Sequence, residues 1–176
     1  MDRLTRFNVD FFNLDSTPYH QVSSNFRLRV LSDTFHKKNE LLLRELIFLI
    51  FNKESRIDST FISGYIVNGK RRREKVGLGK IFKLKNWKEI IVKDEVFEEE
   101  EVIFATVKEL DRYNIYKYCM KVTSGYMNSA YIIFYNDSFM LYLSSDVLDV
   151  ISYNDKLIND LKLKLPKEII DQHHDN

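Results

Sequence analysis

The hydrophobic pattern along the first half of the chain has a period of two in two places. Between residues 25 and 31, apolar positions alternate with arginines, and this alternation predicts a half-buried strand. Residues 60–67 have the same β character and lead into Asn68 and Gly69. Because Asn-Gly tolerates the positive φ angles of a tight hairpin turn, residues 70–76 are expected to return as an antiparallel strand.

A second hairpin is predicted near the C-terminal end. Residues 130–135 and 138–143 are rich in aromatic and aliphatic side chains, which suit a pleated, buried surface. Asn136 and Asp137 lie between them, and these residue types favour turns. The hairpin is therefore the clearest β signal in the chain.

Two further segments are assigned to strands. Residues 80–84 follow a glycine-rich bend and are expected to extend the sheet. Residues 102–107 also fit a strand, although a helix over residues 98–110 remains an alternative, because a short apolar run does not by itself distinguish the two.

The run from residue 33 to residue 52 predicts a central helix. Leu42, Leu43, Leu46 and Leu49 recur at spacings of three and four, as they do on one face of a helix. Other apolar residues widen this face, so we expect the helix to be buried and contacted on more than one side.

Three more helices are expected in the second half of the chain. The middle one follows Ser144, Ser145 and Asp146, whose side chains suit an N-cap and the first helical turn. The three expected helices cover residues 108–122, 146–151 and 155–165.

The order of these elements favours an α+β fold built on a largely antiparallel sheet. Strands and helices are mixed without the regular rhythm of βαβ units. The chain has 176 residues, of which 44% are hydrophobic and 14% aromatic, enough for one domain with a substantial core. We expect a single domain over residues 1–166 and a polar tail over residues 167–176.

Aromatic residues of the second hairpin occur at positions of both parities, for example Tyr131, Phe134 and Tyr142. Either both faces of that hairpin are covered, or one face presents tyrosines to solvent. Exposed tyrosines are favoured at protein interfaces, so the second possibility supports a protein-binding role.

Composition excludes several classes of protein. Cys119 is the sole cysteine, so an intrachain disulfide and a cysteine-cluster metal site are both ruled out. The most apolar window, residues 41–51, is shorter than the roughly 20 residues that a membrane span needs. No signal-peptide pattern opens the chain. We therefore expect a cytoplasmic protein with no membrane partner, no cofactor and no metal.

The net charge of +1 hides a strong segregation of charge. Residues 70–88 hold nine bases and one acid, a net charge of +8, whereas residues 89–101 hold seven acids and one base, a net charge of −6. Three interpretations follow. The two segments neutralise each other in the fold, one of them meets a complementary protein, or the basic segment binds nucleic acid.

Catalytic motifs are missing from the sequence. It contains no phosphate-binding glycine loop, no His-Glu-x-x-His zinc motif and no nucleophile elbow. We therefore predict that the chain is not an enzyme. The alternative is an unrecognised site in which His20, His36 and Cys119 come together.

Residues 131–147 carry a resemblance to a known class of proteins. They combine a strand, an Asx turn, a returning strand and the sequence Ser-Ser-Asp. This segment, roughly a tenth of the chain, resembles elements of small immunity proteins from bacterial polymorphic-toxin and contact-dependent growth inhibition systems. The Lys-, Asn- and Ile-rich, motif-free character of the chain is similar as well. The resemblance implies a non-catalytic protein that binds a cognate toxin domain and blocks its active site.

Our leading hypothesis is therefore a cytoplasmic immunity-type inhibitor that acts by binding another protein. Toxins of this kind are often nucleases with basic clefts, so an acidic segment is the expected contact surface. The candidate partner-binding residues are Glu95, Glu98, Glu99, Glu100 and Glu101.

The alternative hypothesis is a nucleic-acid-binding module. Clustered bases neutralise phosphates, and interleaved aromatic rings stack on bases. The residues that would serve this role are Lys70, Arg71, Arg72, Arg73, Lys75, Lys80, Lys83, Lys85 and Trp87.

Overall fold

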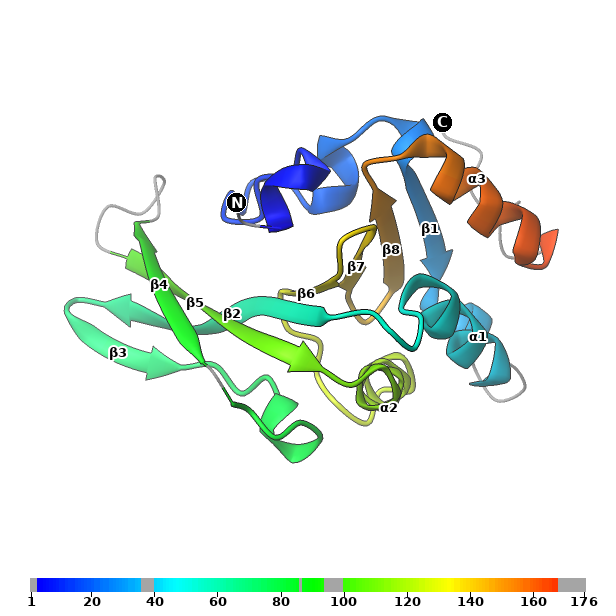
Figure 1. Cartoon of the computed structure of the whole chain (residues 1–176). Coiled ribbons are helices and arrows are strands. Elements are labelled where there is room, and N and C mark those ends of the chain that lie inside the picture. The colour runs from blue at the N-terminus through cyan, green and yellow to red at the C-terminus, as the bar shows by residue number, and fades with distance from the viewer. Residues whose placement is uncertain (1–2, 36–39, 86, 94–99, 168–176) are drawn as a thin grey trace.

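An eight-stranded sheet in which every pairing is antiparallel forms the centre of the molecule (Figure 1). The computed structural model describes residues 3–35, 40–85, 87–93 and 100–167. The predicted α+β class is confirmed. The strands are β1 (Arg27–Leu31), β2 (Ile57–Val67), β3 (Lys70–Arg73), β4 (Lys88–Lys93), β5 (Glu100–Leu110), β6 (Ile132–Tyr135), β7 (Phe139–Leu143) and β8 (Val147–Ser152).

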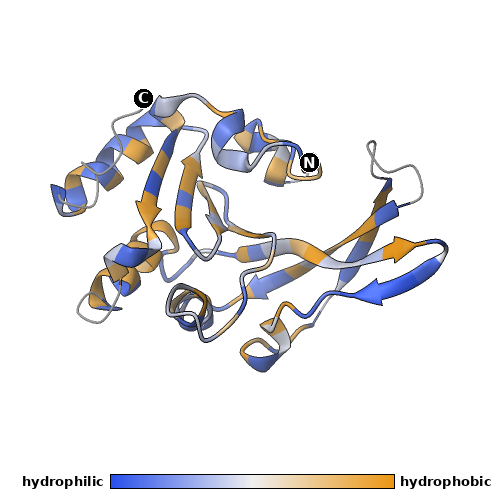
Figure 2. Cartoon of the chain, turned by 180° about the vertical axis from the view of Figure 1, so that it is seen from behind, coloured by the Kyte–Doolittle hydropathy of each residue, from blue (hydrophilic) through white to orange (hydrophobic). Residues whose placement is uncertain are grey.

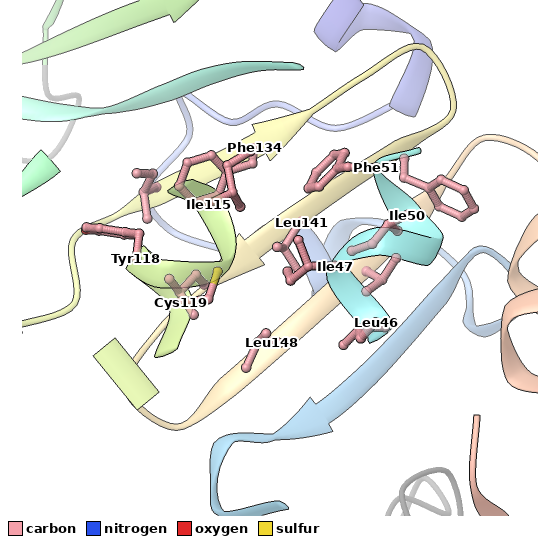
Figure 3. Close-up of a cluster of buried hydrophobic side chains, with 14 of the residues drawn as sticks. Leu46, Ile47, Ile50, Phe51, Ile115, Tyr118, Cys119, Phe134, Leu141 and Leu148 are labelled. Carbon is pink, nitrogen blue, oxygen red and sulfur yellow. The ribbon is translucent and has the colours of Figure 1, made fainter. Parts of the chain in front are cut away.

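One face of the sheet is covered by the helices. Leu46 and Ile47 of the first helix and Ile115 of the second pack on Phe134 and other sheet residues in one continuous core (Figure 3). Asp111 begins the second helix, because its carboxylate accepts hydrogen bonds from two backbone N–H groups of the first turn. The helices are α1 (Glu40–Ile50), α2 (Arg112–Thr123) and α3 (Asp155–Lys164).

The N-terminal segment covers the opposite face of the sheet. Phe7 and Phe11 are buried against Phe104, Tyr135 and Tyr142 in a second apolar cluster. Both faces of the C-terminal hairpin are therefore covered, and its aromatic residues of both parities are core residues. The suggestion that its tyrosines form an exposed interface is not supported. The short helices of this segment are η1 (Arg3–Phe7), η2 (Pro18–Gln21) and η3 (Ser24–Phe26).

A buried ion pair joins β1 to β8 beneath the N-terminal segment. The Nε and Nη2 groups of Arg29 donate hydrogen bonds of 2.6 and 2.8 Å to the carboxylate of Asp149, whose exposed fraction is 0%. Burial raises the pKa of Asp149, and the Arg29 guanidinium opposes that rise. Arg29 also lies 3.8 Å from the ring centre of Tyr19 in η2, so the pair helps to hold the N-terminal segment on the sheet.

The helix predicted over residues 146–151 is wrong, because this segment forms β8. The hydroxyl of Ser144 accepts hydrogen bonds from the N–H groups of Asp146 and Val147, so it caps a tight turn between β7 and β8. Leu148 and Val150 then face the helices, while Asp149 faces the other side and meets Arg29. A period of two in a six-residue run is hard to separate from a helical pattern.

The central helix is shorter than predicted, and one of its leucines is exposed. The structure places a short 3₁₀ helix, η4 (Ser32–Phe35), before α1, and residues 36–39 lie outside the described residues. Leu41 of α1 is 72% exposed. The helix is therefore amphipathic, but it is contacted on more than one side as predicted, because Ile47 packs in the sheet core and Phe48 meets Arg112 of α2.

The strand predicted over residues 80–84 is also wrong. Gly77 adopts a φ of 67° and begins a 3₁₀ turn, η5 (Leu78–Lys80). Leu78 and Phe82 enter the helix-side core from this turn, as their spacing of four permits in a helical turn.

Between the strand and helix alternatives for residues 98–110, the structure confirms the strand, β5, and α2 begins only after it.

An arm extends from one end of the sheet, on the left of Figure 1. It consists of residues 64–67 of β2, the strands β3 and β4, and residues 100–106 of β5. The predicted Asn68-Gly69 turn is confirmed, with φ angles of 51° and 70°. We call the rest of the sheet, with the helices and the N-terminal segment that cover it, the body. Because β2 pairs with β6 through residues 58–61 and with β3 through residues 64–67, the same edge of β2 pairs first in the body and then in the arm.

Gly64 lies at the point where β2 changes partner. The register of β2 against β5 shifts between Ile62 and Gly64, and a Cβ on Gly64 would collide with the backbone carbonyl oxygen of Arg72. Only a residue without a side chain allows β3 to approach this closely.

Removal of the buried carboxylate is expected to destabilise the body. Asp149→Ala leaves Arg29 as an uncompensated, mostly buried charge, so the free energy of unfolding should fall by about 3–5 kcal/mol in a denaturant titration. Asp146→Ala removes an exposed carboxylate nearby and should change it by less than about 0.5 kcal/mol. Arg29→Met with Asp149→Leu should recover most of the loss. Equal effects of the two alanine variants would contradict this account.

A methyl group at Gly64 is expected to loosen the arm. Gly64→Ala should lower the free energy of unfolding by about 1–3 kcal/mol because of overpacking, and hydrogen exchange should accelerate at the β3 amides. Gly79→Ala is the matched control, since its nearest neighbour lies 4.0 Å from the new methyl group. If β3 exchanged at the wild-type rate in Gly64→Ala, the close approach would not limit the arm.

Candidate partner-binding surface

The bases predicted from the sequence are all exposed, on β3, on the segment that follows it and at the start of β4. Every residue of β3 is exposed, because this strand lies at an edge beyond the cover of the helices. Figure 2 shows β3 as a continuous hydrophilic strand. We call the following nine exposed residues the basic surface: Lys70, Arg71, Arg72, Arg73, Lys75, Lys80, Lys83, Lys85 and Lys88.

The acidic segment is only partly described. Glu95, Glu98 and Glu99 lie outside the described residues, whereas Glu100 and Glu101 open β5 and are half-buried. Their strand neighbours in β2 are Val67 and Ile66. Among the described residues, the acidic surface predicted as the contact site is therefore represented by two partly covered side chains.

One ion pair links the two charge segments inside the arm. Arg71 of β3 donates a hydrogen bond to the carboxylate of Glu89 in β4. The Arg71 guanidinium is the main cause of a lowered pKa at Glu89. Neutralisation between the segments thus occurs at this position, and in the described part of the chain the other bases of the basic surface are exposed to solvent.

Large apolar side chains accompany these bases. Trp87 is 41% exposed, and its ring meets Phe61 of β2 edge-on, with 5.5 Å between the ring centres. Ile90 and Ile91 of β4 are 46% and 55% exposed. An indole that is fixed by its neighbour and still open to solvent is a typical anchor at protein interfaces.

An open cavity of about 560 Å³ lies where the arm joins the body. Lys88 and Lys108 line it from β4 and β5, and Arg56 lines it from the loop before β2. A smaller hollow of about 390 Å³ shares Lys88 and Lys108 and reaches Trp87. The cavity is therefore continuous with one side of the basic surface.

The polar wall of this cavity is held by a network around Asp58 of β2. Arg3 donates a hydrogen bond of 3.2 Å to one oxygen of Asp58, and the backbone N–H of Glu109 donates one of 3.2 Å to the other. Glu109 has a φ of 60°, a conformation that costs a non-glycine residue about 1–2 kcal/mol. The Thr60 hydroxyl lies within hydrogen-bond distance of Thr106 and Tyr135, which adds a hydroxyl cluster to the same region.

Sequence patterns missed the cavity residues Arg3, Arg56 and Lys108. They lie far apart in the chain, and each has an ordinary polar surrounding in the sequence. The positive φ of Glu109 is likewise set by the tertiary structure. No local sequence signal distinguishes these residues from other surface charges.

Of the alternative catalytic residues, the two that the structure describes, His20 and Cys119, are not brought together. Cys119 is completely buried in α2, and burial raises the pKa of its thiol. This placement confirms the interpretation of Cys119 as a small core residue. His20 is exposed and packs edge-on against Tyr19, while His36 lies outside the described residues. Among the described parts of the chain, no group of three or more His, Cys, Asp or Glu side chains is placed to hold a metal ion.

Comparison with protein-family models, curated proteins and solved structures finds no match to this chain. In the described parts of the chain, no helix combines the length and the apolar character that crossing a bilayer requires.

Proposed function

We propose that the chain is an immunity-type inhibitor that binds a cognate toxin protein through its arm. The observation that carries this proposal is the combination of nine exposed bases, an exposed tryptophan and an adjoining cavity at one end of the molecule. The apolar core of the body is already covered on both faces by the chain itself. The arm and the segment next to it are therefore the part of the molecule whose charged and aromatic side chains are available to a partner.

The positive charge of the basic surface indicates the kind of partner surface that it binds. Complementary fields accelerate encounter between two proteins and exclude wrong partners. An acidic surface on the toxin domain matches the basic surface, and an acidic side chain fits the cavity between Lys88 and Lys108. This assignment differs from the acidic contact segment expected from the sequence. It rests on the described residues, in which the bases are the more exposed group.

Trp87 supplies the apolar part of the proposed interface. Tryptophan and arginine dominate the binding energy of many protein complexes, and Arg72 and Arg73 lie exposed on β3 of the arm. The edge-on packing against Phe61 fixes the indole before binding, which lowers the entropy cost of association.

Nucleic-acid binding is the second candidate, and the exposed Trp87 among bases is the observation that favours it. Two observations oppose it. Glu74 is exposed within the same basic run and would repel phosphates. Glu89 forms an ion pair with the guanidinium of Arg71. This pairing reduces the positive charge that is available to a nucleic-acid backbone.

Charge reversal on the basic surface is expected to abolish protection against the toxin. The first step is to identify a gene for a secreted protein beside the gene of this chain; the probe is the C-terminal domain of that protein, co-expressed with this chain in a bacterial host. Arg72→Glu with Lys83→Glu should lower the affinity at least tenfold by calorimetry and should abolish growth rescue, because two attractive contacts become repulsive. Lys156→Glu with Lys164→Glu makes the same charge change at exposed sites on α3 and should leave both readouts unchanged.

A salt titration separates the two candidate functions. The isolated protein is mixed with single-stranded and duplex oligonucleotides over a range of salt concentrations. Micromolar affinity that falls steeply with salt, and that the basic-surface variant loses, would support nucleic-acid binding in place of the inhibitor. Failure of the wild-type chain to rescue growth would also count against the inhibitor proposal.

A further inference from the structure

Among the described residues, β4 ends the sheet at the arm, and no strand pairs with its outer edge. The strand order runs from β1 to β4, and among the described residues only β5 pairs with β4. Its six residues pair with β5 in a continuous register from Lys88 to Lys93. An edge of this kind presents a row of unpaired backbone N–H and C=O groups.

The centre of this edge lacks the devices that usually prevent strands from pairing. Edge strands are commonly protected by a bulge, a proline or a charge in the middle of the strand. In β4 the register has no bulge, and the central residues are Ile90, Ile91 and Val92. Ile90 and Ile91 are both about half exposed, one on each face of the strand. The charged residues lie only toward its ends.

The sequence of β4 is complementary to itself in one antiparallel register. If Ile91 lies opposite Ile91 of a second copy, then Glu89 lies opposite Lys93, and Ile90 lies opposite Val92. Opposite charges and apolar side chains that face each other across two strands stabilise their pairing. Because the twofold axis passes through Ile91, each of the other two contacts occurs twice.

Neighbouring registers lose this match. Side chains alternate between the two faces of a strand, so a symmetric pair can shift only by steps that keep facing residues on the same side of the sheet. The next such register toward the N-terminal end places Glu89 opposite Ile91. The next one toward the C-terminal end places Lys93 opposite Ile91. Each sets a charge against an apolar side chain, and register is strongly specified where facing side chains differ in this way.

We propose that two copies of this chain associate through β4 to form a symmetric dimer with one continuous antiparallel sheet. The axis is perpendicular to the sheet, so the helix-covered faces of both copies lie on the same side. Glu89 of each copy then meets Lys93 of the other on that side, and Ile90 meets Val92 on the opposite side. A six-residue strand pair is smaller than a standard stable interface of about 1,600 Å², so the dimer has a dissociation constant in the micromolar range.

This proposal is independent of the proposed inhibitor function. It uses the outer edge of β4, whereas the charge-reversal test of partner binding changes Arg72 and Lys83. It is measured on the isolated chain as a mass, with no toxin or nucleic acid present. Either proposal can therefore fail while the other stands.

The experiment is sedimentation of the full chain over a range of concentrations. The wild-type mass should rise from monomer to dimer through the micromolar range. Ile91→Lys places two ammonium groups on the twofold axis and should keep the protein monomeric. Leu41→Lys replaces another exposed apolar residue, on α1, and should dimerise like the wild type. Wild-type protein that stays monomeric at hundreds of micromolar would overturn the proposal.

A charge swap tests the register. Lys93→Glu places like charges opposite each other at two symmetric positions and should weaken dimerisation about tenfold or more. Glu89→Lys combined with Lys93→Glu restores opposite charges across the interface and should recover the dimer. Both changes also disturb contacts within one copy, where Glu89 meets Arg71 and Lys93 lies opposite Glu101. Recovery in the double variant therefore reports pairing between copies, and no recovery would contradict this register.

Discussion

The architecture depends on the ability of β2 to pair with three strands. Its inner edge bonds to β6 through residues 58–61 and to β3 through residues 64–67, while its other edge bonds to β5. The change of partner from β6 to β3 takes place at Ser63, whose carbonyl accepts a hydrogen bond from the N–H of Glu74. Without this exchange at a glycine-containing irregularity, β3 and its bases would have no partner strand, and the arm would consist only of β2, β5 and β4.

The chemistry of the two parts follows from how they are covered. In the body, helices lie on one face and the N-terminal segment on the other, so even Tyr135 and Tyr142 are core residues. One charge in this layer, Asp149, is retained through its pairing with Arg29. The distal arm extends beyond both covers. Its edge strands therefore tolerate bases, as in β3, or leave apolar side chains such as Ile91 in contact with solvent.

Only part of the candidate surface could be predicted from the sequence. The run of bases and Trp87 stood out because they are contiguous, and the structure confirms their exposure. Arg56 and Lys108 join them only because the antiparallel pairing of β2 with β5 brings residues some fifty positions apart to one cavity. The immunity-type function remains a proposal, supported by this surface and by the resemblance of residues 131–147.

The sequence alone determined the α+β class, the two hairpins and the segregation of charge, because periodicity, turn chemistry and residue charge are local properties. It did not determine that residues 147–152 form a strand. Asp149 is stable there only because β1 supplies Arg29 from 120 positions away. The tertiary structure also decided which apolar residues stay exposed, since burial depends on which elements cover a face. For this reason the position of β4 at the end of the sheet, as the described residues form it, became visible only once the order of the strands was known.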